Sequence, residues 1–214
     1  SNYIYTYGTL NVTGSGTIVA GTDGALRCYN VLNFNGPTIR GGTYSYGAAI
    51  RTSDGTVTMS GGTITGANTT SWGPVYVQRG TFTMTGGSIS GNNAPFGSAI
   101  GVFNGTVNLR GGTISNNTGD WGAIYLQSGN AALNMSNGTI SGNDYYGIGA
   151  SGGVVTMSGG TITNHSDNGV YVKKSTSESY PGPGTFTMTG GNITNNANQG
   201  VYASNGATFT MSNS

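Results

Sequence analysis

The sequence is short of charge, cysteine and proline. Of its 214 residues only 6% are charged, the formal net charge is +1, and there are one Cys and five Pro. Ordinary globular proteins carry about 25% charged residues. So low and balanced a charge gives no electrostatic footprint for nucleic acid or for an anionic membrane. The single cysteine, Cys28, excludes an internal disulfide, so stability must come from packing and hydrogen bonds.

Long apolar runs are also missing. No run approaches the roughly 20 residues that span a bilayer, so membrane insertion is not expected. No secretory leader is expected at the start of this sequence, since both of its ends cut into an internal repeat. We therefore expect an excised segment of a longer protein, with Ser1 and Asn2 as a cloning scar. A hydrophobic share of 35% with few prolines argues against a disordered linker.

Glycine, by contrast, is abundant at 41 residues, and it punctuates an internal repeat. The segment Thr-Val-Thr-Met-Ser-Gly-Gly-Thr-Ile-Thr at 56–65 has five further clear copies and weaker ones at 9–19 and 31–40. Intervals of 25, 25, 25, 26, 22, 31 and 23 residues separate the equivalents of its methionine, which are Phe34, Met59, Met84, Leu109, Met135, Met157, Met188 and Met211.

Each repeat holds three short segments with the period of two that is typical of β-strands. The first carries Val57 and Met59 on one face, the second carries Ile64 between two threonines, and the third is 75–77. Gly61-Gly62 permits a tight corner between the first two. Strands too short to bury a face alone must stack.

The sequence therefore predicts a single domain over residues 1–214. Its fold class is all-β, a right-handed parallel β-helix of about eight coils with three short strands each, and roughly 40 Å long. A β-propeller does not fit, because it needs four strands and roughly 40 residues per blade.

Stacking predicts columns of like residues along the rod. The apolar positions of the three strands form inward columns, with Cys28 at the position of Val77 as a small buried residue. Stacked side chains after the Ile strand are expected to hydrogen-bond along the rod, as a polar ladder of Ala67, Asn92, Asn117, Asn143, His165 and Asn196.

The repeats resemble a known family. Gly80–Asn92 with Gly97–Val102, and Gly105–Asn116 with Gly122–Leu126, follow the pattern G-T-[FV]-T-M-[ST]-G-G-[TS]-I-[ST]-G-N and then G-x-[AV]-[IY]-x-V, with substitutions. This pattern is similar to the adhesin-like β-helix repeats of large bacterial and archaeal surface proteins, and more distantly to polymorphic outer-membrane protein repeats. The resemblance implies an extracellular or cell-surface location. Similar coils also occur in pectate-lyase-like enzymes.

Little in the sequence resembles an active site. Asp120, Asp144 and Asp167 fall in one loop region of successive coils and are the best acid cluster, although aspartates are also common in solvated turns. The single histidine, His165, is interpreted as a ladder member. No Cys/His cluster suits zinc, and no catalytic residue, metal or cofactor is predicted.

Aromatic residues precede the third strand in five consecutive coils, at Tyr46, Trp72, Phe96, Trp121 and Tyr146. Aromatic faces stack on sugar rings, so these residues are the predicted ligand-binding site for a polysaccharide or host glycan. The alternative is that the rings fold over the corner and seal the core. A second outward column on the third strand adds tyrosines, and consists of Arg27, Arg51, Tyr76, Gly101, Tyr125, Gly149, Tyr171 and Tyr202.

Two other surface features leave alternatives open. Thr-x-Thr pairs such as Thr56/Thr58 and Thr63/Thr65 resemble those of ice-binding proteins, and they also suit strands structurally. The insertion at 173–184 is either part of a binding face or a tolerated loop.

We thus expect a structural and adhesive surface segment that binds glycans. A carbohydrate-active enzyme and an ice-binding protein are the alternatives. Open solenoid ends expose strand edges, and no capping helix is predicted at either terminus. The ends are therefore expected either to self-associate end to end or to fray.

Overall fold

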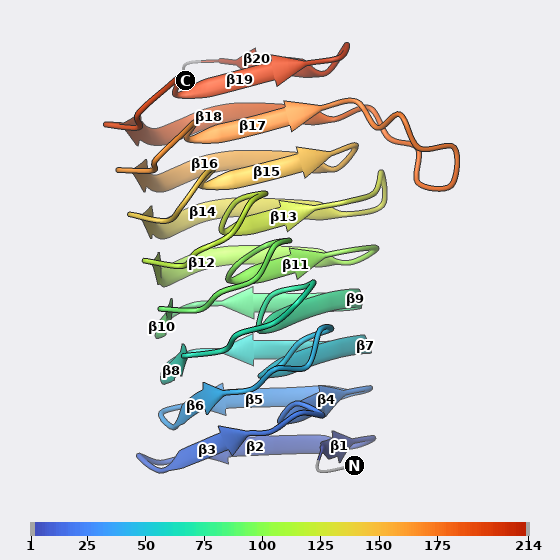
Figure 1. Cartoon of the computed structure of the whole chain (residues 1–214), viewed down its shortest axis with the longest axis vertical. Helices are drawn as coiled ribbons and strands as arrows, with labels where there is room; N and C mark the ends of the chain where they lie inside the picture. The colour runs from blue at the N-terminus through green and yellow to red at the C-terminus, as the bar shows by residue number, and fades with distance from the viewer. Residues whose placement is uncertain (1–2, 213–214) are drawn as a thin grey trace.

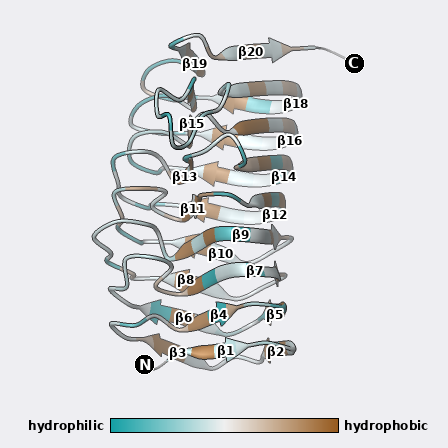
Figure 2. Ribbon diagram, turned by 90° about the vertical axis from the view of Figure 1, so that its right-hand side faces the viewer, coloured by the Kyte–Doolittle hydropathy of each residue, from teal (hydrophilic) through white to brown (hydrophobic). Residues whose placement is uncertain are grey.

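The computed structural model describes residues 3–212 and shows a parallel β-solenoid of about eight turns, as the repeat predicts. Ser1 and Asn2, the expected cloning scar, lie outside the described residues. Figure 1 shows the turns stacked into a rod with the two termini at opposite ends. No helix occurs among residues 3–212. In the view of Figure 2 the apolar colour lies mainly on strands and much less on the corner loops.

Each turn contributes a strand to three faces, here called face 1, face 2 and face 3 for the segments of Val57, Ile64 and Val75. The short strands of face 1 are β2 (Thr9–Thr13), β5 (Val31–Asn35) and β20 (Thr208–Met211). Those of face 2 are β3 (Thr17–Ala20), β6 (Thr38–Gly41), β8 (Thr63–Thr65) and β10 (Ser88–Ser90). Those of face 3 are β1 (Ile4–Thr6), β4 (Leu26–Cys28), β11 (Ile100–Val102), β13 (Ile124–Leu126), β15 (Ile148–Ser151), β17 (Val170–Lys173) and β19 (Val201–Ser204).

The remaining strands are longer because they continue around a corner. Two pass from face 3 to face 1, β7 (Ile50–Met59) and β9 (Val75–Met84). Four pass from face 1 to face 2, β12 (Thr106–Ser115), β14 (Ala132–Ser141), β16 (Val154–Thr163) and β18 (Thr185–Thr194). Their pairing registers shift at the corners, for example between Leu109 and Thr113, where the chain bends.

The predicted inward columns are confirmed. Val57 pairs with Phe82, Met59 with Met84, and Ile64 with Ile89, each in register with its equivalent in the next turn. These side chains are fully buried and belong to one continuous core cluster. Burial of apolar surface contributes about 25 cal/mol per Å², so the columns supply the main stabilising term. Cys28 is likewise fully buried, as its alignment predicts.

The Gly-Gly corner between faces 1 and 2 depends on the absence of a side chain. Gly62 has φ of 83°, and a Cβ there would lie 2.4 Å from the carbonyl oxygen of Pro37 in the preceding turn. Gly87 repeats this geometry one turn later, with the same φ. Any larger residue would push successive turns apart at this corner.

The polar ladder forms as predicted, at the corner after face 2. Asn92 Nδ2 donates to Asn117 Oδ1 at 2.9 Å, and Asn117 Nδ2 donates to Asn143 Oδ1 at 2.9 Å. Each amide also donates to the Ile carbonyl of the previous turn, as Asn92 does to Ile64 at 3.2 Å. The ladder oxygens also accept from backbone N–H groups at the corner, those of Ala67 and Asn92, each at 3.1 Å.

His165 takes the next place in this ladder, which confirms the sequence interpretation. Its Nδ1 accepts from the Asn143 backbone N–H at 3.2 Å, and its Nε2 donates to the Ile140 carbonyl at 3.2 Å. These two nitrogens reproduce the acceptor and donor of an Asn amide. Burial, as the largest cause, lowers the pKa of His165, and the histidine is 2% exposed.

Candidate functional site

The candidate site is the outer surface of face 3 together with the corner residues that precede it; we call it the aromatic strip. The predicted outward column is confirmed by strand pairing, since Arg51 pairs with Tyr76, Tyr76 with Gly101, and Gly101 with Tyr125. The corner aromatics reach the same surface. Trp72 and Phe96 pair directly through a parallel bridge, so these two rings keep the register of the turns.

The centre of the strip is a second, smaller apolar cluster. Trp72, Tyr76 and Tyr125 are 7%, 5% and 6% exposed, and Phe96 and Trp121 pack against them while staying half-buried. Trp72 lies 5.7 Å from Phe96 at 40°, and Trp121 lies 5.6 Å from Tyr125 at 49°. The rings are therefore tilted and do not form one coplanar platform. Trp72 covers the strand beneath it, whereas Phe96 and Trp121 keep part of their surface in solvent.

Two glycines in the outward column make this packing possible. A Cβ on Gly101 would lie 2.4 Å from Cε3 of the Trp72 ring. A Cβ on Gly149 would lie 2.3 Å from the Trp121 carbonyl oxygen and 3.3 Å from the Tyr125 ring. Tyrosine and glycine alternate from Tyr76 to Tyr171, where Gly101 leaves room for the Trp72 ring and Gly149 for the Trp121 backbone.

Tyr46 and Tyr146, the remaining predicted site residues, extend the strip toward its ends. Tyr46 is 43% exposed and contacts Tyr76 at 5.7 Å, while Tyr146 stacks on Tyr171 at 4.8 Å and 25°. Burial raises the pKa of Tyr76 and Tyr146 to about 12. Their hydroxyl groups are therefore neutral hydrogen-bonding groups at physiological pH.

Cations lie against the rings of the strip. Lys173 Nζ is 4.5 Å from the Trp121 ring centroid, and the Arg51 guanidinium carbon is 5.6 Å from the Tyr76 ring centroid. Both geometries are within the reach of cation–π attraction. From the sequence Arg51 is recognisable only as a member of the outward column. Its contacts with aromatic rings depend on where those rings lie in the structure.

The insertion at 173–184 projects beyond the other corners in Figure 1 and also contacts an earlier turn. The Gly129 N–H donates to the Pro181 carbonyl at 3.1 Å, and the Tyr180 ring meets Phe103 edge-on at 4.9 Å. Together they line a hollow of about 360 Å³ beside the strip. Sequence reasoning missed Phe103. Extending the alternation of β11 by one residue would have placed it outward.

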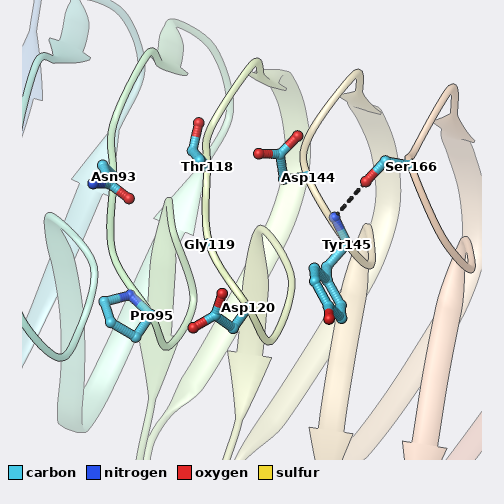
Figure 3. Close-up of a pocket in the computed structure, with 8 residues that line it drawn as sticks. All are labelled: Asn93, Pro95, Thr118, Gly119, Asp120, Asp144, Tyr145 and Ser166. Carbon is cyan, nitrogen blue, oxygen red and sulfur yellow. Dashed lines mark hydrogen bonds between the residues drawn. The ribbon is translucent and has the colours of Figure 1, made fainter.

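The structure divides the predicted acid cluster. Asp120 and Asp144 line one hollow of about 400 Å³, on adjacent loops, as Figure 3 shows. Asp167 is not among the residues of this hollow, and its carboxylate accepts from Asn168 at 2.8 Å and Asn198 at 2.7 Å. Within residues 3–212 no three His, Cys, Asp or Glu side chains gather in a way that could hold a metal ion.

The threonine arrays are in register but mixed in composition. On face 2, Thr63 pairs with Ser88 and Thr65 with Ser90, so hydroxyls form regular ranks. On face 1, Asn108 interrupts the array and donates to Thr83 Oγ1 at 3.4 Å, and Asn134 donates to Asn108 Oδ1 at 3.0 Å. The face 1 array is therefore partly an external amide ladder.

Among the described residues, no helix has the length and apolar character needed to cross a membrane. No family model matches the chain, and no curated protein and no solved structure is found similar to it.

Proposed function

We propose that this chain is a rigid structural and adhesive segment of an extracellular or cell-surface protein, and that its aromatic strip binds glycans. The carrying observation is the row of partly exposed rings held on one face by a packed aromatic cluster. Phe96 and Trp121 pack against the buried rings of this cluster, which restricts their motion. A ring that is already immobile loses little conformational entropy when a sugar stacks on it.

The edge of the strip supplies polar groups suited to sugar hydroxyls. Gln78 and Lys173 are half-buried beside the rings, and neutral tyrosine hydroxyls add donors and acceptors. Tilted rings with polar groups between them suit a polysaccharide chain that lies along the rod. Successive sugar rings of such a chain would be rotated relative to one another. The unbroken stack of turns supports the spacer role, because each turn is fixed by its neighbours.

Trp121→Ala is the sharpest test of this proposal, because Trp121 is half-buried whereas Trp72 is nearly covered. On an array of mucin and plant glycans, binding should fall about fivefold or more from wild type to Trp121→Ala, by analogy with the stacking of a nucleic-acid base on one aromatic ring, which is worth about 1–3 kcal/mol. Val19→Ala removes a side chain that is 69% exposed on β3 of face 2, outside the strip, and should leave binding unchanged. Equal binding by wild type and Trp121→Ala would refute the assignment of the strip.

A carbohydrate-active enzyme is the second candidate, favoured by the hollow that Asp120 and Asp144 share. Paired carboxylates serve as acid and base, or as acid and nucleophile, in glycoside hydrolysis. Incubation with polysaccharides, followed by a reducing-end assay, should release sugar ends from wild type and not from Asp120→Asn. No release by wild type would remove this candidate and leave the adhesive proposal intact.

A further inference from the structure

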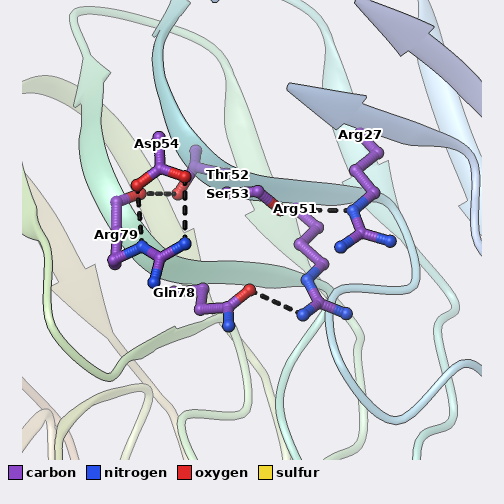
Figure 4. A network of polar contacts seen from close by, with 7 residues as sticks. All are labelled: Arg27, Arg51, Thr52, Ser53, Asp54, Gln78 and Arg79. Carbon is purple, nitrogen blue, oxygen red and sulfur yellow. Dashed lines mark hydrogen bonds and ion pairs between the residues drawn. The ribbon is translucent and has the colours of Figure 1, made fainter. Parts of the chain in front are cut away.

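Two arginines stand side by side at the N-terminal end of the aromatic strip. Arg27 on β4 and Arg51 on β7 are register partners on the outer surface of face 3, in adjacent turns. Figure 4 shows both side chains beside the strands of these turns, with Arg51 reaching toward Gln78. Like charges directly opposite one another destabilise a sheet, so the pair calls for a compensating partner.

No carboxylate of the described chain supplies that compensation. Asp54, the acid drawn in Figure 4, accepts two hydrogen bonds from Arg79, at 2.7 and 3.0 Å. Arg27 Nε donates to Ser53 Oγ at 3.2 Å, and Arg51 donates to Tyr44 Oη and Gln78 Oε1 at 3.2 and 2.6 Å. Within residues 3–212 neither Arg27 nor Arg51 forms an ion pair.

The neutral partners also hold the guanidinium groups in place. Arg27 lies 5.1 Å from the Tyr29 ring centroid, and Arg51 lies 5.9 and 5.6 Å from those of Tyr46 and Tyr76. A guanidinium has five N–H donors, and the bonds above use one of Arg27 and two of Arg51. Arg51 Nε is buried without a partner, so the remaining free donors are on the terminal nitrogens of both residues. Planar, fixed donors of this kind suit a carboxylate or sulfate.

We propose that Arg27 and Arg51 form a subsite for an anionic substituent, a carboxylate or a sulfate, of the glycan bound on the aromatic strip. The ligand class is therefore an acidic polysaccharide. The paired guanidinium groups are found at this end of the strip, whereas farther along it Lys173 is a single cation against Trp121. This inference rests on the proposed glycan binding and adds to it the chemistry and orientation of the ligand.

The test uses an array that presents each glycan backbone in matched neutral, carboxylated and sulfated forms. Wild type should prefer the charged forms, and the preference should weaken with added salt, because exposed charges are screened. In Arg27→Gln/Arg51→Gln the affinity for charged forms should fall about tenfold or more, with that for neutral forms unchanged. The matched control is Arg40→Gln/Arg110→Gln, which removes the same charge from exposed positions outside the strip.

The outcomes separate this proposal from the one it rests on. A preference for carboxylated over sulfated forms, or the reverse, identifies the anion. Equal binding to neutral and charged forms, or a charge preference that survives in Arg27→Gln/Arg51→Gln, overturns the subsite while glycan binding stands. No binding to any glycan overturns both. Thermal unfolding of the double variant and its control shows whether each is folded.

Discussion

Asn92 and Asn93 are neighbours in the chain with different surroundings. Asn92 is 1% exposed, its amide donates to Asn117 and to backbone carbonyls, and its Oδ1 accepts from the Ala67 N–H at 3.1 Å. Asn93 is exposed and makes one side-chain bond, to Asn68 at 2.9 Å. The same amide group is thus structural at one position and a surface group at the next.

We expect Asn92→Ala to lower the free energy of unfolding by about 3 kcal/mol or more, because several buried backbone groups lose their partners. Asn93→Ala is the matched control and should cost less than about 1 kcal/mol. Urea denaturation of both variants measures the difference. Similar losses in the two would mean that the ladder contributes little beyond its packing.

His165, another residue of this ladder, makes the stability of the fold depend on pH. Because burial lowers its pKa from the ordinary 6.5, the unfolded chain binds a proton more readily than the folded one. Stability from this group is therefore complete above about pH 6.5 and is lost as the pH falls toward the lowered folded value.

His165→Asn should remove that loss, since Asn presents the same acceptor and donor without a titrating group. Unfolding midpoints measured between pH 7 and pH 4 should fall less steeply for the variant than for wild type. The comparison with Asn143 at the adjacent rung suggests no penalty at pH 7. Parallel pH profiles for the two proteins would contradict the assignment.

At the scale of strands and faces, the glycines of the outward column determine where neighbouring side chains of the strip can lie. Gly101→Ala places a Cβ against the Trp72 ring, 2.4 Å from Cε3 by the present geometry. The ring must move outward, so we expect red-shifted tryptophan emission, in a Trp121→Phe background, and a stability loss of about 1–3 kcal/mol. Gly16→Ala, where a Cβ would meet nothing within 4 Å, is the control and should change neither. An unshifted emission spectrum would show that Trp72 is not held by Gly101.

The sequence predicts these elements well where residues repeat, and poorly where they do not. The alternation around Val57, Ile64 and Val75 locates the three faces. The Asn residues that recur at one position after the Ile strand locate the ladder, because stacking repeats the same environment in every turn. The tilts of the rings in the strip depend on the size of the side chains beside each aromatic residue, and these side chains differ from turn to turn. The return of the 173–184 insertion to Phe103 has no repeat to predict it.

For the whole molecule, a repeat of 25 residues implies that a turn is an exchangeable unit. Deleting residues 81–105 joins Gly80 to Thr106, and Thr106 is the register partner of Thr81. Val107 and Leu109 would then stack on Val57 and Met59, and Asn117 would meet Ala67 in the ladder. These core and ladder contacts reproduce ones that adjacent turns already make, whereas on face 3 Tyr125 would take the place of Gly101 and displace the Trp72 ring.

We therefore expect the deletion of residues 81–105 to keep the parallel β-structure, and to lower stability by about 1–4 kcal/mol, the share of 25 residues at roughly 0.05–0.15 kcal/mol each. Deleting residues 81–92 removes the face 1 and face 2 strands of one turn and leaves its face 3 strand without them, so this shorter deletion should be the more disruptive one. Circular dichroism and urea unfolding of both distinguish the cases. If the longer deletion unfolds the protein and the shorter one does not, its stability depends on particular residues of the missing turn rather than on stacking between neighbouring turns.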